Sequence, residues 1–389
     1  MERKQDEEIE RWMRRRRRRQ EMRRRRRRRA LIKRAVLAGG TVLVLVLALV
    51  LVLPAVMKRA KKEEGPKEGQ MSGAVGESLI VRGPDGAQSP EETADADSRE
   101  NGGEDADAPE DEEEENPSYR FADAEDMLHP GDELVSSHAI FVDLNEGTVV
   151  AGKEERSRMI PASMTKVLTL LVAAEHTENL DETFAMPAEA VDYSFKYRCS
   201  CAGFEKEELV TVKDLMYGTV LPSGAEAAVG LAMCVAGSHE AFVELMNEKL
   251  EELGLSGTAH FTNCVGVYDD DHYCTAYDMA IIMKAALDDE TCKEVLSART
   301  YLTSATEQHP EGLLLSNWFL RRIEDKDTGG KVSAAKTGFV DESMFCAVSY
   351  GTDNGGKEYI CVTASAPGNW PCINDHVWLY RRFAETGAD

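Results

Sequence analysis

The sequence predicts a mixed α+β globular domain that follows an N-terminal transmembrane helix. Strand-like segments occur in pairs near both ends of the region that begins at residue 121, at 139–150 and at 343–365, and apolar stretches with a helical pattern lie between them. We expect residues 35–57 to form the transmembrane helix, because the segment carries no charge and consists mostly of Leu, Val and Ala.

Charge divides the 389 residues into three parts. Residues 1–59 contain 20 Lys and Arg against 6 Asp and Glu, a net charge of +14. Residues 60–120 contain 6 against 19, which gives −13, and the remainder contains 20 against 45, which gives −25. These values sum to the formal net charge of −24. An acidic protein is ordinarily a poor partner for nucleic acids and anionic membranes. This argument does not apply to residues 1–59, because that part of the chain is basic.

Residues 1–34 form an arginine-rich tail, with basic runs at Arg14–Arg19 and Arg23–Arg29. Such runs can bind nucleic acid, but no aromatic platform or recognised nucleic-acid motif accompanies them, and Trp12 stands alone. We therefore expect no nucleic-acid partner. The tail is interpreted as a cytoplasmic topology determinant that also rests on anionic lipids of the inner leaflet.

Residues 35–57 are expected to anchor the chain in the cell membrane. At about 1.5 Å per residue these 23 residues span roughly 34 Å, enough for a hydrocarbon core of about 30 Å. A cleaved signal peptide has a shorter apolar region and a small-residue cleavage site, whereas Lys58 and Arg59 follow this segment. Eighteen Lys and Arg precede it, which predicts a single-pass protein with a cytoplasmic N-terminus and everything after Met57 outside.

Residues 58–120 are expected to form a disordered acidic linker. The segment is rich in Glu, Asp, Gly, Pro and Ser, includes six consecutive acidic residues at 110–115, and has few apolar residues to bury. A flexible chain of this length has an end-to-end distance of roughly 40–50 Å, so it holds the next domain away from the membrane. The alternative is a calcium-binding tract, but the spaced ligands of a calcium loop are missing.

The region from residue 121 has the pattern of a folded domain. Its predicted elements are a hairpin of Ala139–Leu144 with Gly147–Val150, a buried helix at Val167–Ala174, a second hairpin of Ser343–Tyr350 with Tyr359–Ser365, and a closing amphipathic helix at Asp375–Phe383. If Asn354 and Gly355 centre a regular turn of the second hairpin, Cys346 faces Thr363.

Ser163 and Lys166 are the first candidate catalytic residues. Three positions apart on a helix, they share one face and lie within reach of each other. A serine hydroxyl becomes a good nucleophile when a base takes its proton, and a lysine that is desolvated in a pocket can act as that base. Alone the pair is weak evidence, because most such pairs in a chain of this length lie on solvated helix faces.

Two further motifs follow in order: Ser223-Gly224-Ala225 and Lys336-Thr337-Gly338. Together the three motifs resemble the active-site set of penicillin-binding proteins and class A β-lactamases. The closer resemblance is to the low-molecular-mass D-alanyl-D-alanine carboxypeptidases, the serine peptidase family S11. It covers about 135–383 and is carried by the stretches IPASMTKVLT (160–169), LVTVKDLMYGTVLPSGAE (209–226), FVELMNEKLEELGL (242–255), FTN (261–263) and HYCTAYDMA (272–280).

The resemblance implies a β-lactamase/penicillin-binding-protein transpeptidase-like fold, in which an antiparallel sheet packed by helices lies beside a helical lobe. It implies that residues 121–389 are a D,D-carboxypeptidase domain that faces the cell wall. The resemblance further implies that the domain removes the terminal D-Ala from peptidoglycan stem peptides that end in D-Ala-D-Ala, and that β-lactams inhibit it. No cofactor is expected.

The resemblance also assigns roles to individual residues. Ser163 attacks the substrate carbonyl, Lys166 accepts its proton, and Ser223 relays a proton to the departing D-alanine. Lys336, Thr337 and Gly338 form the substrate-binding motif, with Lys336 and Thr337 holding the substrate carboxylate. The backbone N–H groups of Ser163 and Phe339 form the oxyanion hole.

The sequence departs from the resembled families at two places. Ala225 stands where the family usually has Asn, whose amide contacts the substrate, and losing that contact costs about 1–3 kcal/mol of transition-state stabilisation. Residues 256–261 lack the carboxylate that a class A β-lactamase uses to activate water. Because Ser163, Lys166, Ser223 and the third motif all remain, an active carboxypeptidase is favoured. A β-lactamase or D,D-transpeptidase on the same fold and a catalytically weak peptidoglycan-binding scaffold stay open as alternatives.

Cysteine and histidine residues give weaker signals. The nine cysteines lie in the predicted exterior, where disulfides form, but a domain of this size does not need them, so we expect buried free thiols. Cys199 and Cys201 are the best disulfide or redox candidates. The set His260, Cys264, His272 and Cys274 fits no standard zinc spacing, so no metal is expected, and His272 and Asn263 are interpreted as structural residues beside the active site.

Overall fold

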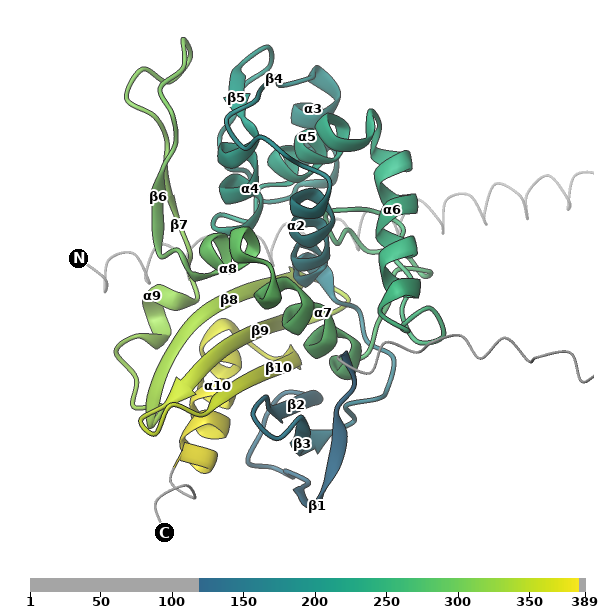
Figure 1. The fold of residues 1–389 in the computed structure, drawn as a ribbon, viewed down its shortest axis with the longest axis vertical. Helices are drawn as coiled ribbons and strands as arrows, with labels where there is room; N and C mark the ends of the chain where they lie inside the picture. The colour runs from purple at the N-terminus through teal and green to yellow at the C-terminus, as the bar shows by residue number, and fades with distance from the viewer. Residues whose placement is uncertain (1–118, 385–389) are drawn as a thin grey trace, which may run out of the picture. The chain divides into compact units, whose positions relative to one another are not determined.

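A six-stranded sheet forms one layer of the protein in the computed structural model, which describes residues 119–384 (Figure 1). The strand order is β1-β3-β2-β10-β9-β8, and every neighbouring pair is antiparallel except β1 with β3. The strands are β1 (Ala122–Leu128), β2 (His138–Asp143), β3 (Thr148–Lys153), β8 (Gly330–Val340), β9 (Met344–Asp353) and β10 (Glu358–Ala366).

Both faces of this sheet are buried, so its central strands are apolar on both sides. In β2, Ile140 and Val142 point into the larger hydrophobic cluster, whereas Phe141 points into a smaller one with Tyr380 and Leu379 of α10 (Asn369–Ala384). This alternation follows from the two-residue period of a strand. One face is thus covered by α10 and the other by α7 (Ala276–Asp288) and α8 (Glu290–Ser297).

The helical lobe lies beside the sheet. Its helices are α2 (Lys166–Glu175), α3 (Ala188–Tyr197), α4 (Val212–Val220), α5 (Ala225–Ala236) and α6 (His239–Glu252), with α7 (Ala276–Asp288) and α8 (Glu290–Ser297) between the lobe and the sheet (Figure 1). Short ribbons complete it: β4 (Thr183–Ala185) with β5 (Leu209–Thr211), and β6 (Thr300–Leu302) with β7 (Leu314–Ser316), which leads to α9 (Leu320–Ile323).

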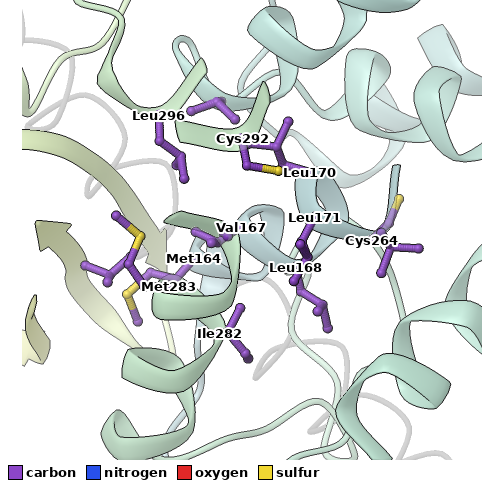
Figure 2. Packing of buried hydrophobic residues seen from close by; sticks show 14 of the residues in the cluster. Met164, Val167, Leu168, Leu170, Leu171, Cys264, Ile282, Met283, Cys292 and Leu296 are labelled. Carbon is purple, nitrogen blue, oxygen red and sulfur yellow. The ribbon is translucent and has the colours of Figure 1, made fainter. Parts of the chain in front are cut away.

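Helix α2 runs through the middle of the core. Its residues from Lys166 to Ala173 are all buried, because neighbours surround the helix on every side. Figure 2 shows its leucines between Ile282 of α7, Leu296 of α8 and Cys264. A helix fixed in this way gives a rigid base to the residues at its N-terminus.

The register of the β9–β10 hairpin differs from the predicted one by one residue. Thr363 pairs with Ala347, not with Cys346, because the turn has three residues at its centre instead of two. The backbone N–H of Asp353 donates to the carbonyl of Lys357, and Gly356 takes a left-handed φ of 90°. Three-residue turns of this kind require such a residue. Cys346 and Cys361 consequently point to opposite faces of the sheet.

The structure confirms the mixed α+β architecture and the predicted strands and helices, with shifts of a few residues at their ends. The predicted tail (1–34) and transmembrane helix (35–57) lie outside the described residues, as does the acidic linker (58–120) except its last two residues. Between residues 119 and 384 no single helix has the length and apolar character to cross a membrane. The pair α5 and α6, bent by 84°, meets those criteria jointly.

Candidate active site

Ser163 and Lys166 meet at the N-terminus of α2. Ser163 lies in the short 3-10 helix η2 (Ala162–Thr165), which packs against β8, and its side chain is partly exposed. Lys166 is completely buried, and its Nζ lies 3.1 Å from the Ser163 Oγ. Ala162, the residue before the serine, has a left-handed φ of 48°, a strained backbone of the kind that concentrates at functional sites.

Burial sets the protonation of Lys166. Removal of its ammonium group from water lowers its pKa from 10.5 to about 8, although Cys199, Cys264 and the carboxylate of Glu226 act in the opposite direction. About one tenth of the amine is therefore neutral at pH 7, far more than for a lysine with the ordinary pKa of 10.5. The geometry and this pKa together suit Lys166 to take the proton of the Ser163 hydroxyl.

The carbonyl of Val265 gives Lys166 a second partner, at 2.8 Å from Nζ. Asn263 holds that carbonyl in place, because its Oδ1 accepts from the backbone N–H groups of Val265, Gly266 and Val267. The sequence interpretation did not include Val265. A backbone acceptor leaves no side-chain pattern, and the FTN stretch at 261–263 was the one available signal.

Ser223 and Lys336 form the second pair of the site. Lys336 Nζ donates to Ser223 Oγ at 2.8 Å and to the carbonyl of Thr337 at 2.8 Å. Lys336 is buried, with 1% of its surface exposed, and burial together with the nearby Lys166 holds its pKa well below 10.5. Ser223 and Thr337 are partly exposed. The site thus contains two buried amines, and each is hydrogen-bonded to the hydroxyl of a partly exposed serine.

Gly338 lets β8 approach the backbone of Ser163. A Cβ at this position would lie 2.8 Å from the carbonyl oxygen of Pro161 and 3.0 Å from the backbone nitrogen of Ser163. Contacts this short are not available to a larger residue, so glycine is required. The approach brings the N–H of Ser163 close to the strand that continues into Phe339, the other predicted oxyanion donor.

Ala225 is fully buried and begins α5, two residues after Ser223. Its backbone N–H donates to the carbonyl of Ser200 at 2.8 Å. The methyl side chain cannot form a hydrogen bond, so the site lacks the amide that the family's Asn would supply at this position.

His272 and Asn263 are structural neighbours of the site, as expected. Burial lowers the pKa of His272 to about 3, so its imidazole is neutral. The N–H of Thr262 donates to its Nδ1 at 3.0 Å, which leaves Nε2–H to donate to Thr165 Oγ1 at 2.8 Å. This bond ties the 262–272 segment to the 3-10 helix that carries Ser163.

All nine cysteines lie within the described residues and are free thiols, and six of them are buried, which confirms that part of the prediction. Cys199 and Cys201 are not bonded to each other. Among residues 119–384 no group of three or more His, Cys, Asp or Glu side chains is arranged to hold a metal ion.

Several known proteins are similar to this chain in sequence. The model of the D-alanyl-D-alanine carboxypeptidase family, peptidase S11, matches residues 124–368. The D-alanyl-D-alanine carboxypeptidase DacF of Bacillus subtilis is 32% identical over 208 residues, which cover 54% of this chain and 52% of that protein. The D-alanyl-D-alanine carboxypeptidase of Streptomyces sp. K15 is 28% identical over 227 residues, 55% of this chain and 75% of the relative. The chain thus spans about half the length of some relatives that it matches.

Solved structures share the fold. The Streptomyces K15 DD-transpeptidase superposes with a TM-score of 0.59 at 23% identity, covering 67% of this chain and all of the other. The D-alanyl-D-alanine carboxypeptidase of Mycobacterium tuberculosis gives a TM-score of 0.58 at 22% identity, covering 69% and 97%. The transpeptidase-like fold implied by the three motifs is therefore confirmed.

Proposed function

The chain belongs to the D-alanyl-D-alanine carboxypeptidase family of serine peptidases (S11), and from this premise we propose that it removes the terminal D-Ala from peptidoglycan stem pentapeptides. The observation that carries the proposal is the 3.1 Å contact between Ser163 Oγ and the buried amine of Lys166, whose pKa is lowered to about 8. This arrangement supplies an activated nucleophile at the N-terminus of a rigid helix.

In the first half of the reaction, Ser163 Oγ attacks the carbonyl carbon of the penultimate D-Ala and its proton passes to Lys166. The N–H groups of Ser163 and Phe339 stabilise the oxyanion. Lys336 and Thr337 hold the terminal carboxylate. As the C–N bond breaks, Ser223 gives its proton to the leaving D-alanine nitrogen and takes a proton from Lys336, whose Nζ donates a hydrogen bond to it.

In the second half, water adds to the ester of Ser163. Its proton leaves through the same groups, the bond between Oγ and the acyl carbon breaks, and Oγ regains a proton. The product is a stem peptide shorter by one residue. β-Lactams imitate the D-Ala-D-Ala end, so we propose that they acylate Ser163 and inhibit the enzyme.

Two assays test this function. A fluorescent penicillin is expected to label the protein and to lose all labelling in Ser163→Ala. Release of D-alanine from a pentapeptide muropeptide is expected from the wild type and not from the variant. Absence of both labelling and release would leave a peptidoglycan-binding scaffold as the better interpretation.

A D,D-transpeptidase is the second candidate, because the Streptomyces K15 protein that shares this fold is named for that activity. Both activities share the acyl-enzyme and differ in whether water or an amine attacks it. Adding D-amino acid or glycyl acceptors to the pentapeptide assay separates them: a transpeptidase forms an amide product in place of the hydrolysed peptide. Rapid turnover of a chromogenic cephalosporin would instead identify a β-lactamase.

We also propose that residues 35–57 anchor the protein as a single-pass cell-membrane protein, with residues 1–34 in the cytoplasm on anionic lipids and the catalytic domain facing the cell wall. Sequence supports this: a 23-residue uncharged segment follows eighteen basic residues. A topology reporter fused after Asp389 is expected to be active outside the cytoplasm, and cytoplasmic activity would reverse the orientation.

A further inference from the structure

Glu226 is a buried carboxylate beside the site that the proposed reaction does not use. It is the second residue of α5 and only 1% exposed. Its Oε1 accepts from the backbone N–H groups of Ala202, at 2.5 Å, and Gly203, at 2.8 Å. Its Oε2 is buried and makes no hydrogen bond of good geometry among the described residues, although the Cys201 thiol lies close enough for the carboxylate to raise the pKa of that thiol. A buried, half-satisfied carboxylate is costly, so its presence calls for a reason.

Glu226 holds a loop against the turn that carries Ser223. The loop, residues 199–204, follows α3 and meets the turn through backbone contacts. The carbonyl of Ser200 accepts from Ala225 N–H at 2.8 Å. A Cβ on Gly224 would lie 2.8 Å from the backbone nitrogen of Ala202. Ser223 itself has a strained, left-handed φ of 63°, which the surrounding structure must maintain. The two bonds accepted by Glu226 complete this support.

Glu226 also supplies negative charge to Lys166. Its carboxylate favours the protonated form of Lys166, and Lys166 favours the ionised form of Glu226. Burial raises the pKa of Glu226 above its ordinary value, and the backbone donors Gly203 and Ala202 together with Lys166 offset part of this rise. The N-terminus of α5 also favours the ionised carboxylate. The other groups that act electrostatically with Lys166 are Cys199, Cys264, Lys336 and His272. Burial raises the pKa of the Cys264 thiol to about 12, so that thiol is neutral.

We propose that Glu226 is a positioning residue of this active site: its carboxylate clamps the 199–204 loop onto the Ser223 turn and supplies negative charge to the buried amine of Lys166. This inference rests on the proposed function in that it assigns the charge a role in controlling the base. Because Ala225 has no polar group, Glu226 is the charged side chain at the start of α5 that acts electrostatically on Lys166.

The direct test is an NMR titration of the full-length protein with 13C-labelled lysine Cε, in which Lys166→Met assigns the Lys166 signal. The wild-type midpoint is expected at about 8. In Glu226→Gln, which keeps an acceptor for both backbone N–H groups, the midpoint is expected to fall by about one pH unit, because the charged amine loses its counter-charge. The reciprocal measurement follows Glu226 with 13C-labelled glutamate, whose midpoint is expected to rise in Lys166→Met.

Glu208→Gln is the matched control. Glu208 is equally buried, and its carboxylate accepts from Glu205 N–H at 2.7 Å, Thr306 Oγ1 at 2.6 Å and His309 Nδ1 at 2.8 Å. It supports the chain next to the same loop but is not among the groups that shift Lys166. Its substitution is expected to leave the Lys166 midpoint unchanged.

An unchanged Lys166 midpoint in folded Glu226→Gln, or an equal shift in Glu208→Gln, overturns the proposal. If Glu226→Gln does not fold, an unchanged Glu226 midpoint in Lys166→Met overturns it. The rate of acylation by a fluorescent penicillin is measured beside these titrations, and its acid limb is expected to move to lower pH in Glu226→Gln. A wild type that no penicillin labels contradicts the proposed function, whereas the titrations still decide the role of Glu226.

Discussion

Lys336 donates a hydrogen bond of 2.8 Å from its Nζ to the Oγ of Ser223, across 113 residues of sequence. Lys336 belongs to β8 of the sheet, and Ser223 to the turn before α5 of the helical lobe. The bond therefore joins the two layers at the proposed substrate site. Burial and the nearby Lys166 lower the pKa of Lys336. A substrate carboxylate that binds beside Lys336 is expected to raise this pKa, because a negative charge stabilises the ammonium form.

Substitution of Ser223 is expected to separate activity from stability. Ser223→Ala and Ser223→Gly both remove the hydroxyl, and both are expected to lower kcat/KM for D-alanine release by about 10²–10⁴-fold. At a φ of 63° glycine is much less strained than alanine, so Ser223→Gly is expected to be more stable than Ser223→Ala by about 1 kcal/mol. Urea unfolding of both variants measures this difference. Equal midpoints would contradict a strained backbone at this residue.

Replacement of Lys166 by Met is expected to stabilise the protein in a pH-dependent way. The folded pKa is about 8, below the ordinary 10.5, so the unfolded chain binds more protons between these values and wild-type stability rises with pH there. The contribution is on the order of 3 kcal/mol. The stability advantage of Lys166→Met over the wild type is therefore expected to shrink by about that amount from pH 7.5 to pH 10.5.

Thermal unfolding of the two proteins across this pH range tests the effect. Lys284→Met is a suitable control, because Lys284 pairs with Asp288 at the protein surface. Its difference from the wild type is expected to change little with pH. A difference between Lys166→Met and the wild type that is independent of pH would show that Lys166 keeps an ordinary pKa.

The sequence predicted that Ser163 lies beside Lys166, and it selected Ser223 and Lys336 as candidate site residues, because these side chains occur in motifs with recognisable spacing. Ser163 and Lys166 are one helical turn apart, and the two later motifs have characteristic residues. Backbone groups carry no such signature. The carbonyl of Val265, which meets Lys166 from 99 residues away, could not be found by spacing.

Glu226 illustrates a second limit. Its place after Ala225 was visible, but the sequence does not reveal that its carboxylate turns towards the backbone of Ala202 and Gly203. The predicted register of the β9–β10 hairpin was wrong for a related reason. The run of Asp353, Asn354, Gly355 and Gly356 allows turns of two or three residues. The hydrogen bonds of Asp353, rather than the residue types, select the longer one.

Gly338→Ala is expected to disrupt the approach of β8 to Ser163. The added Cβ would lie 2.6 Å from Cys346 Sγ, 2.8 Å from the carbonyl of Pro161 and 3.0 Å from the nitrogen of Ser163. Displacement of the proposed oxyanion donors, the N–H groups of Ser163 and Phe339, is expected to lower penicillin acylation by about 10²-fold or more. Adding Cys346→Ala relieves only the contact with sulfur, so the double variant is not expected to recover.

Gly257→Ala provides the control for this prediction, because nothing lies within 4 Å of a Cβ at Gly257. Its acylation rate is expected to equal that of the wild type. A Gly338→Ala variant with wild-type acylation would show that the strand can move without loss of the oxyanion hole.

Ala225→Asn tests the departure from the family motif. The asparagine amide is expected to make the substrate contact that a methyl group cannot, and to raise kcat/KM for D-alanine release by about 5- to 100-fold, equivalent to about 1–3 kcal/mol. Ala225 is fully buried at the start of α5, so the larger side chain also costs about 1–3 kcal/mol of stability.

Ala225→Leu separates the amide from its volume, because leucine is larger than alanine but has no hydrogen-bonding group. It is expected to lose stability like Ala225→Asn and to gain no activity. Steady-state kinetics with a pentapeptide muropeptide, beside thermal unfolding, distinguishes the two. If Ala225→Asn and Ala225→Leu change kcat/KM alike, the amide makes no contact with the substrate, and residue 225 does not face the substrate.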